Sequence, residues 1–268
     1  MNLRAALQWI SCVLFCLAAS GTFAAEPASV GVVFMHGKWG SPDRVIDGLT
    51  RAIAERGFLV ATPEMPWSRK RAYDRSVEET IADIEGVVRD LRAKGAKRIV
   101  VGGHSLGAAL ALAYAGRHQV DGLLIIAPGH NPGAIRFQKL LGPDVARARA
   151  AIAAGKSSAV DTYADLNTGD RTGNVRASAT AYLSYFDPDG PMTFLQNAKG
   201  VKAGTAVLWA APTREDGSFR TLSSQGFRNL PPSPGHRHIE PEADHIGAPA
   251  AVIPDVLDWL NKVLVPGS

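Results

Sequence analysis

The residues best suited to chemistry lie near the middle of the chain, where a serine stands between two glycines. The pattern G-x-S-x-G is matched by Gly103, His104, Ser105, Leu106 and Gly107. An apolar run at Arg98–Gly102 precedes the motif and another at Leu106–Ala115 follows it, which predicts a sharp turn between a strand and a helix. In such a turn Gly103 and Gly107 allow strand and helix to approach without Cβ clashes, and Ser105 is presented as a nucleophile.

A serine hydroxyl attacks poorly at neutral pH unless a base accepts its proton and an acid orients that base. In proteins with this serine turn the chain order is serine, acid, histidine, so the base should be a late histidine. His245 fits, because it comes between the last predicted strand and the last predicted helix. His236 and His238 are also late, but they fall in or just before that strand, where packing or solvation is expected.

Two carboxylates compete for the role of the acid. Glu215 and Asp216 both follow the strand predicted at Ala206–Ala211, which is where the chain order places the acid. Asp187 and Asp189, in the segment before that strand, are minor alternatives. The motif alone leaves the choice between Glu215 and Asp216 open.

The elements that must position these residues alternate between strands and helices. Strands are predicted at Val30–Met35, Phe58–Ala61, Arg98–Gly102, Leu123–Ala127, Ala206–Ala211 and His238–Glu240. Helices are predicted at Asp43–Glu55, Ser76–Lys94, Leu106–Ala115 and Ala250–Leu264. This alternation predicts an α/β fold with a mostly parallel sheet of about six strands, helices on both faces and the active site at the carboxyl ends of the strands.

One connection, after the fourth strand, is longer than a simple crossover needs. Residues 128–200 are predicted to form a cap or lid inserted into a single domain that spans residues 25–268. Helices are expected in this insert at Ile135–Leu141, Val145–Ala154 and Ser178–Tyr185.

The start of the chain is typical of a signal peptide over residues 1–24. Arg4 precedes the apolar run Leu7–Ala19, and Thr22-Phe23-Ala24 places the expected cut after Ala24. Both cysteines of the chain lie within this segment, so the mature protein is expected to have no disulfide. These features predict an exported protein, periplasmic or secreted.

Charge and hydropathy limit the expected partners. The formal net charge of +4 is small for 268 residues and predicts no nucleic-acid partner. The short basic cluster at Arg69–Arg71 is expected to be a solvated loop. No later apolar run reaches the roughly 20 residues of a transmembrane helix, so no stable membrane insertion is expected.

The serine turn, the late histidine and the alternating elements together resemble the α/β-hydrolase superfamily, nearest to small bacterial esterases and dienelactone hydrolases. Many members look like Val-Leu-Trp-hydrophobic-hydrophobic-Gly-Thr-Arg-Asp at the acid loop. That run aligns with Val207–Trp209 and Thr213–Arg214, which puts Glu215 at the acid position and favours it over Asp216. Pro212 departs from the usual glycine, and a serine nucleophile argues against the dienelactone hydrolases in particular.

The loop after the first strand is similar to the His-Gly motif of this superfamily. It begins with His36 and Gly37, and the resemblance implies that the Lys38 amide donates a hydrogen bond to the oxyanion. The serine turn itself supplies the other expected donor, the Leu106 amide, directly after the nucleophile. We expect His36, Gly37 and His104 to support the site.

These features predict an exported serine hydrolase that cleaves an ester or related acyl bond through a Ser105, acid, His245 triad and an acyl-enzyme. Neither a cofactor nor a metal is expected, and the expected partner is a small-molecule or lipid-like acyl substrate. Two alternatives stay open: an acyltransferase that uses the same triad, and a binding protein that kept the fold without catalysis.

Overall fold

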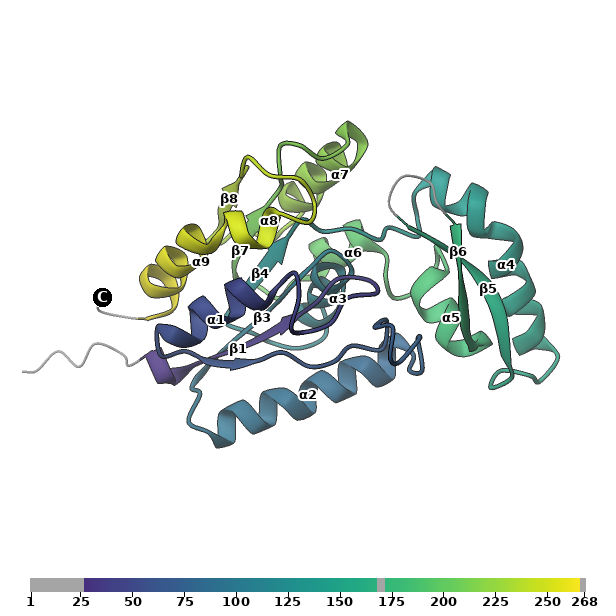
Figure 1. Cartoon of the computed structure of the whole chain (residues 1–268), viewed down its shortest axis with the longest axis horizontal. Helices are drawn as coiled ribbons and strands as arrows, with labels where there is room; N and C mark the ends of the chain where they lie inside the picture. Colours follow the sequence, from purple (N-terminus) through teal and green to yellow (C-terminus); the bar gives the residue numbers. More distant parts are fainter. Residues whose placement is uncertain (1–26, 168–171, 266–268) are drawn as a thin grey trace, which may run out of the picture.

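Six parallel strands form the central sheet, in the order β2-β1-β3-β4-β7-β8 (Figure 1). The computed structural model describes residues 27–167 and 172–265, so the predicted signal peptide and its cleavage site lie outside the described residues. The strands of the sheet are β1 (Val30–Met35), β2 (Leu59–Ala61), β3 (Arg98–His104), β4 (Gly122–Ile126), β7 (Ala206–Ala210) and β8 (Arg237–Ile239). All six predicted strands are confirmed, with small shifts at their ends.

Both faces of the sheet are buried, which explains why its strands are continuous apolar runs. Successive residues of β1 point to opposite faces: Val32 and Phe34 pack in one core cluster, and Val33 and Met35 pack in the other. The helices on the first face are α1 (Asp47–Glu55), α8 (Ala248–Ala251) and α9 (Ile253–Trp259). The helices on the second face include α2 (Val77–Ala93) and α3 (Leu106–Ala115).

Individual residues explain where the helices begin and where they are interrupted. Ser76 and Glu79 form the capping box expected at the start of α2. The helix predicted at Ala250–Leu264 is interrupted at Val252 instead, and its last turn, Leu260–Leu264, is a π-helix. Pro254 explains the interruption, because a proline lacks the amide hydrogen and its ring clashes with the carbonyl of residue 250 in a continuous helix. Within the described residues, no helix has the length and apolar character needed to cross a membrane.

Most of the insert after β4 lies beside the main sheet, whereas its last helix packs against α3 of the main domain (Figure 1). Its elements are α4 (Ile135–Ala153), β5 (Val160–Leu166), β6 (Thr172–Ser178), α5 (Ala179–Phe186) and α6 (Phe194–Gly200). The expected helical insert is confirmed, but the antiparallel hairpin of β5 and β6 was not predicted. The first two expected helices are also joined into one, α4, which continues through Pro143.

A continuous apolar stripe explains why α4 tolerates its proline. Phe137, Leu141, Val145 and Ala148 recur at helical spacing on both sides of Pro143, and all four are buried. An interior proline costs about 3 kcal/mol or more, whereas burying a single leucine-sized side chain contributes about 1.5–3 kcal/mol. The stripe as a whole therefore outweighs the local preference to break the helix.

Candidate active site

Ser105 lies on the turn between the end of β3 and the start of α3, as the motif predicts. Its backbone has φ 58° and ψ −118°, a strained conformation for a residue other than glycine. The turn is very tight: a Cβ atom at Gly103 would lie 2.4 Å from the Gly107 carbonyl carbon, and one at Gly107 would lie 2.4 Å from the Met35 oxygen. Glycine is therefore required at both positions, and the Ser105 amide is held by a 3.1 Å hydrogen bond to the Ile126 carbonyl.

Gly129, in the loop after β4, lies close to both Ser105 and His245. A Cβ atom built on Gly129 would lie 3.2 Å from Ser105 Oγ and 3.6 Å from His245 Cε1. The Gly129 amide also donates to the Ser105 carbonyl over 3.3 Å. The structure thus brings the serine and the late histidine to the same small volume, which a side chain at residue 129 would fill.

The imidazole of His245 is paired with Glu215. His245 Nδ1 lies 2.5 Å from Glu215 Oε1, and the side chains are only 20% and 11% exposed. The two loops that carry them are joined by backbone hydrogen bonds, among them the Arg214 amide to the Ala243 carbonyl at 3.0 Å. A neutral histidine that donates Nδ1–H to this carboxylate has Nε2 free to accept a proton.

The other carboxylates that the sequence offered lie elsewhere. Asp216 is the N-cap of α7 (Gly217–Arg228), where its side chain accepts from the Ser218 amide at 2.9 Å. Asp187 and Asp189 both pair with Arg149 on α4, at 2.5 Å and 2.8 Å.

His104 is hydrogen-bonded to the backbone of the loop that carries His245. Its Nε2 lies 2.8 Å from the His245 carbonyl oxygen, which can only accept, so Nε2 carries the proton. Burial, together with the nearby His245, lowers the pKa of His104 to about 3. His104 is therefore a neutral donor at any ordinary pH.

The loop after β1 lies directly over the serine turn, since a Cβ atom at Gly37 would lie 3.2 Å from Ser105 Cβ. His36 fixes this loop with both ring nitrogens: Nδ1 donates to the Gly37 carbonyl at 2.8 Å, and Nε2 accepts from the Met65 amide at 3.1 Å. Burial lowers the pKa of His36, which favours this neutral form. Across the described residues, the amides of Lys38 and Leu106 have no hydrogen-bond acceptor, so both can donate to a ligand.

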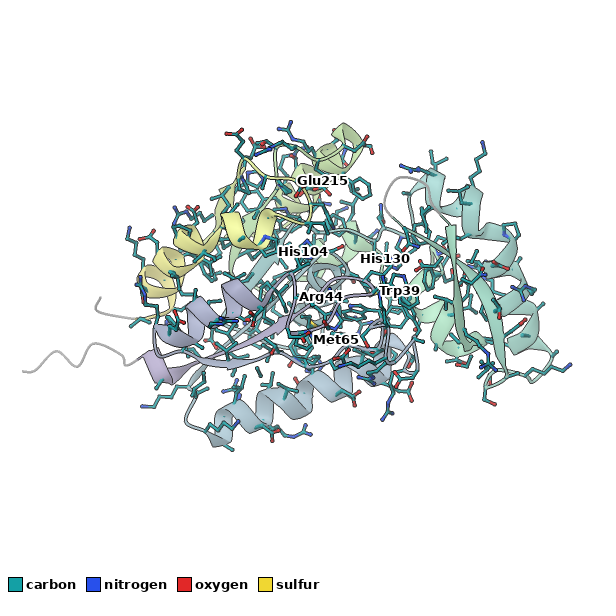
Figure 2. All side chains as sticks on the ribbon, viewed as in Figure 1. Trp39, Arg44, Met65, His104, His130 and Glu215 are labelled. Carbon is teal, nitrogen blue, oxygen red and sulfur yellow. The ribbon has the colours of Figure 1, made fainter. Side chains whose placement is uncertain are left out.

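Sequence reasoning missed two residues beside this loop, Asp165 and His130. Asp165 on β5 is fully buried and accepts from the Lys38 ammonium and the Trp39 indole. His130 lies between the central sheet and the insert, near Trp39 (Figure 2), and its Nε2 donates to the Tyr185 carbonyl at 2.7 Å. A charged residue at an inward-facing strand position was the only local sign of Asp165, and nothing local marked His130.

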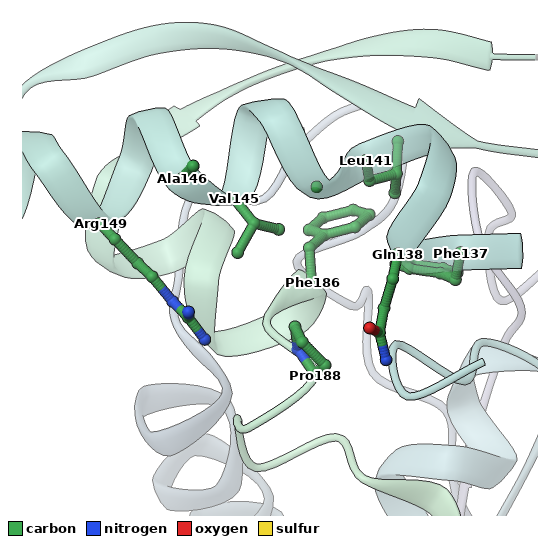
Figure 3. Close-up of a pocket in the computed structure, with 9 residues that line it drawn as sticks. Phe137, Gln138, Leu141, Val145, Ala146, Arg149, Phe186 and Pro188 are labelled. Carbon is green, nitrogen blue, oxygen red and sulfur yellow. The ribbon is translucent and has the colours of Figure 1, made fainter. Parts of the chain in front are cut away.

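A pocket of about 410 Å³ lies between α4 and the end of α5 (Figure 3). Its walls are mainly apolar: Phe137, Leu141, Val145, Ala146, Phe186 and Pro188. The rings of Phe137 and Phe186 also pack against His130. The candidate catalytic residues are not among those that line it, so the pocket belongs to the insert rather than to the catalytic centre.

Comparisons with known proteins agree with this architecture. Residues 32–263 match the alpha/beta hydrolase family. No curated protein matches the chain. Solved structures with a similar fold include a monoacylglycerol lipase of Paleococcus ferrophilus, with 22% identity, a TM-score of 0.61 and coverage of 86% of this chain and 93% of that one.

Two further similar structures are also those of hydrolases. A thermostable carboxyl esterase from Bacillus coagulans has 14% identity and a TM-score of 0.64, with coverage of 88% of this chain and 90% of that one. A structure from work on the metagenome-derived lipolytic enzymes LipS and LipT has 17% identity and a TM-score of 0.62, with coverage of 87% and 94%. These likenesses concern the fold. The family match over residues 32–263 establishes that the chain belongs to the alpha/beta hydrolase family.

Proposed function

We propose that the protein is a serine hydrolase that cleaves an ester or related acyl bond, with Ser105 as nucleophile, His245 as base and Glu215 as acid. The observation that carries the proposal is that the Ser105 hydroxyl and the His245 ring both lie within 3.6 Å of one point, the position of a Cβ atom built on Gly129. The Nδ1 atom of the same ring lies 2.5 Å from Glu215 Oε1. This is the arrangement that turns a weak hydroxyl into a nucleophile.

In the first half of the reaction, Ser105 Oγ attacks the substrate carbonyl carbon and His245 Nε2 takes the hydroxyl proton. The Glu215 carboxylate stabilises the imidazolium that forms. The tetrahedral intermediate then collapses: the bond between the carbonyl carbon and the leaving oxygen breaks, and His245 gives its proton to the departing alcohol. The acyl group remains on Ser105.

In the second half, His245 takes a proton from water, whose oxygen attacks the acyl carbon. Collapse of this second intermediate returns the proton to Ser105 Oγ and releases the acid. In both halves the oxyanion accepts hydrogen bonds from the Leu106 and Lys38 amides, which have no other acceptor among the described residues.

Membership of the alpha/beta hydrolase family supports hydrolysis as the class of reaction, and the esterase and lipase titles of similar folds favour an acyl ester as substrate. The proposal includes export, on the basis of the signal-peptide pattern in residues 1–24. N-terminal sequencing of the protein recovered from the periplasm or medium tests this part, and a chain that keeps Met1 in the cytoplasm would contradict it.

The activity itself is tested with p-nitrophenyl esters from acetate to palmitate, using purified protein without residues 1–24. We expect hydrolysis of at least one ester, and loss of it in Ser105→Ala. The matched control is Ser157→Ala, an exposed serine in the insert, which should retain wild-type rates. A folded wild-type protein that hydrolyses no member of the series would contradict the proposal.

A further inference from the structure

A fully buried carboxylate in the insert holds the loop that carries the second oxyanion donor. Asp165 Oδ1 accepts from Lys38 Nζ at 2.6 Å, and Asp165 Oδ2 accepts from Trp39 Nε1 at 3.0 Å. The Lys38 ammonium also donates to the Leu166 carbonyl at 3.0 Å. One strand of the insert, β5, therefore binds two consecutive residues of the loop after β1.

The loop needs such an anchor because its backbone is strained. Trp39 has φ 56°, in the left-handed region that a bulky residue rarely adopts. Tyr73, whose ring packs edge-on against Trp39 with centroids 5.6 Å apart, has φ 61°. Strained conformations of this kind persist only where the surroundings fix them.

The other anchors of the loop come from the main domain. The Trp39 amide donates to the Trp67 carbonyl at 2.9 Å, and the Trp67 indole donates to the His36 carbonyl at 2.9 Å. These bonds fix the backbone on either side of Lys38. From the insert, Asp165 binds the side chains of both Lys38 and Trp39, and the Leu166 carbonyl accepts a further bond from the Lys38 ammonium.

From this geometry we infer that Asp165 is a positioning residue for the oxyanion hole, which makes catalysis depend on the docking of the β5–β6 hairpin. The inference rests on the proposed function, in which the Lys38 amide stabilises the oxyanion. The Asp165 carboxylate does not touch the reacting atoms. It acts by holding the Lys38 side chain and the Trp39 indole. These contacts fix the position of the Lys38 backbone amide, the proposed oxyanion donor.

Two variants test the contact, because removing only one charge leaves the other buried and unpaired. Asp165→Asn weakens the hydrogen bonds to Lys38 and Trp39 and leaves the Lys38 ammonium without a carboxylate partner. The double variant Lys38→Met/Asp165→Asn removes the ion pair without an uncompensated charge, and it keeps the Lys38 backbone amide. Asp161→Asn is the matched control, because Asp161 is an exposed residue of the same strand that pairs with Arg147 on α4.

Two readouts separate a positioning role from simple stability. We expect kcat of both variants to fall about 10- to 100-fold with KM within about threefold, because a small displacement of an oxyanion donor costs transition-state stabilisation. The inhibition constant of a trifluoromethyl ketone, which forms an oxyanion on Ser105, should rise in parallel with the loss of kcat/KM. Asp161→Asn should leave both quantities at the wild-type value.

The outcomes separate this inference from the proposed function. Wild-type kcat and ketone affinity in the folded double variant, with the wild type active, would overturn the role of Asp165 and leave the hydrolase proposal intact. A wild-type protein that neither hydrolyses esters nor binds the ketone would overturn both.

Discussion

The imidazole of His104 donates from Nε2 to the backbone carbonyl of His245, over 2.8 Å. The residue just before the proposed nucleophile thus holds the loop of the proposed base. The two rings also pack together, with centroids 4.8 Å apart. A residue that the motif leaves unspecified is therefore a direct link between the serine turn and the histidine loop.

Replacing His104 with leucine should lower kcat by up to about tenfold, because a partly buried hydrogen bond to the His245 carbonyl is lost, at a cost of about 0.5–1.5 kcal/mol. His104→Gln keeps an amide donor close to the position of Nε2 and should retain most of the activity. Steady-state kinetics on the best p-nitrophenyl ester compare the two. Equal activity in the leucine and glutamine variants would show that this hydrogen bond has no part in catalysis.

The pair Glu215→Gln and Asp216→Asn tests the choice of acid. We expect the first change to lower kcat by about 10³-fold or more, since the carboxylate that orients His245 is lost. The second should change kcat less than about twofold, but it weakens the N-cap of α7 and should lower the free energy of unfolding by about 1 kcal/mol or less. The reverse ranking of the two kcat values would assign the acid to Asp216.

The choice between these neighbours shows where sequence reasoning reaches its limit. The serine turn and the six strands follow from local apolar runs and close glycine contacts, so they could be predicted. Glu215 and Asp216 differ by one position in a loop. Which of them faces His245 is fixed by the backbone hydrogen bond from Arg214 to Ala243 and by the role of Asp216 as the N-cap of α7.

The hairpin of β5 and β6 could not be predicted for a related reason. Its inward-facing side chains include Asp165, a residue that disfavours burial unless a partner neutralises it. That partner, Lys38, lies 127 residues earlier in the chain. The contacts that stabilise the insert are therefore between distant segments and leave little periodic pattern in the sequence.

Gly129 offers a steric test of the site. Gly129→Ala places a methyl group 3.2 Å from Ser105 Oγ, in the space that the proposed mechanism assigns to the acyl carbon. We expect kcat/KM to fall about 10-fold or more, while stability changes little. Gly133→Ala, in the same loop, serves as control, because its Cβ would be 3.5 Å from only the Asn131 side chain. Equal rates in the two variants would place the reacting carbonyl elsewhere.

Stability should fall as the pH is lowered through the range in which an unfolded histidine titrates. Burial lowers the pKa of His36, His104 and His130 below 6.5, that of His104 to about 3. Below pH 6.5 the unfolded chain therefore binds protons that the folded protein does not, so the free energy of unfolding decreases with falling pH. Above this range the three groups are neutral in both states and contribute no pH dependence.

Urea unfolding of the wild type and His104→Gln at several pH values between about 4 and 7 measures this effect. Each such histidine contributes a slope of up to about 1.4 kcal/mol per pH unit, so the variant should show a shallower decline by roughly that amount. Identical slopes would contradict this, because they would mean that His104 binds its proton over the same pH range in the folded and the unfolded protein.

The central claim, that Ser105 is an activated nucleophile, is tested most directly by labelling the folded protein with a fluorophosphonate and locating the adduct by mass spectrometry. We expect one adduct, on Ser105, that is absent in Ser105→Ala and forms much more slowly in His245→Ala. A folded wild-type protein that stays unlabelled, or one that is labelled at another serine, would contradict the account.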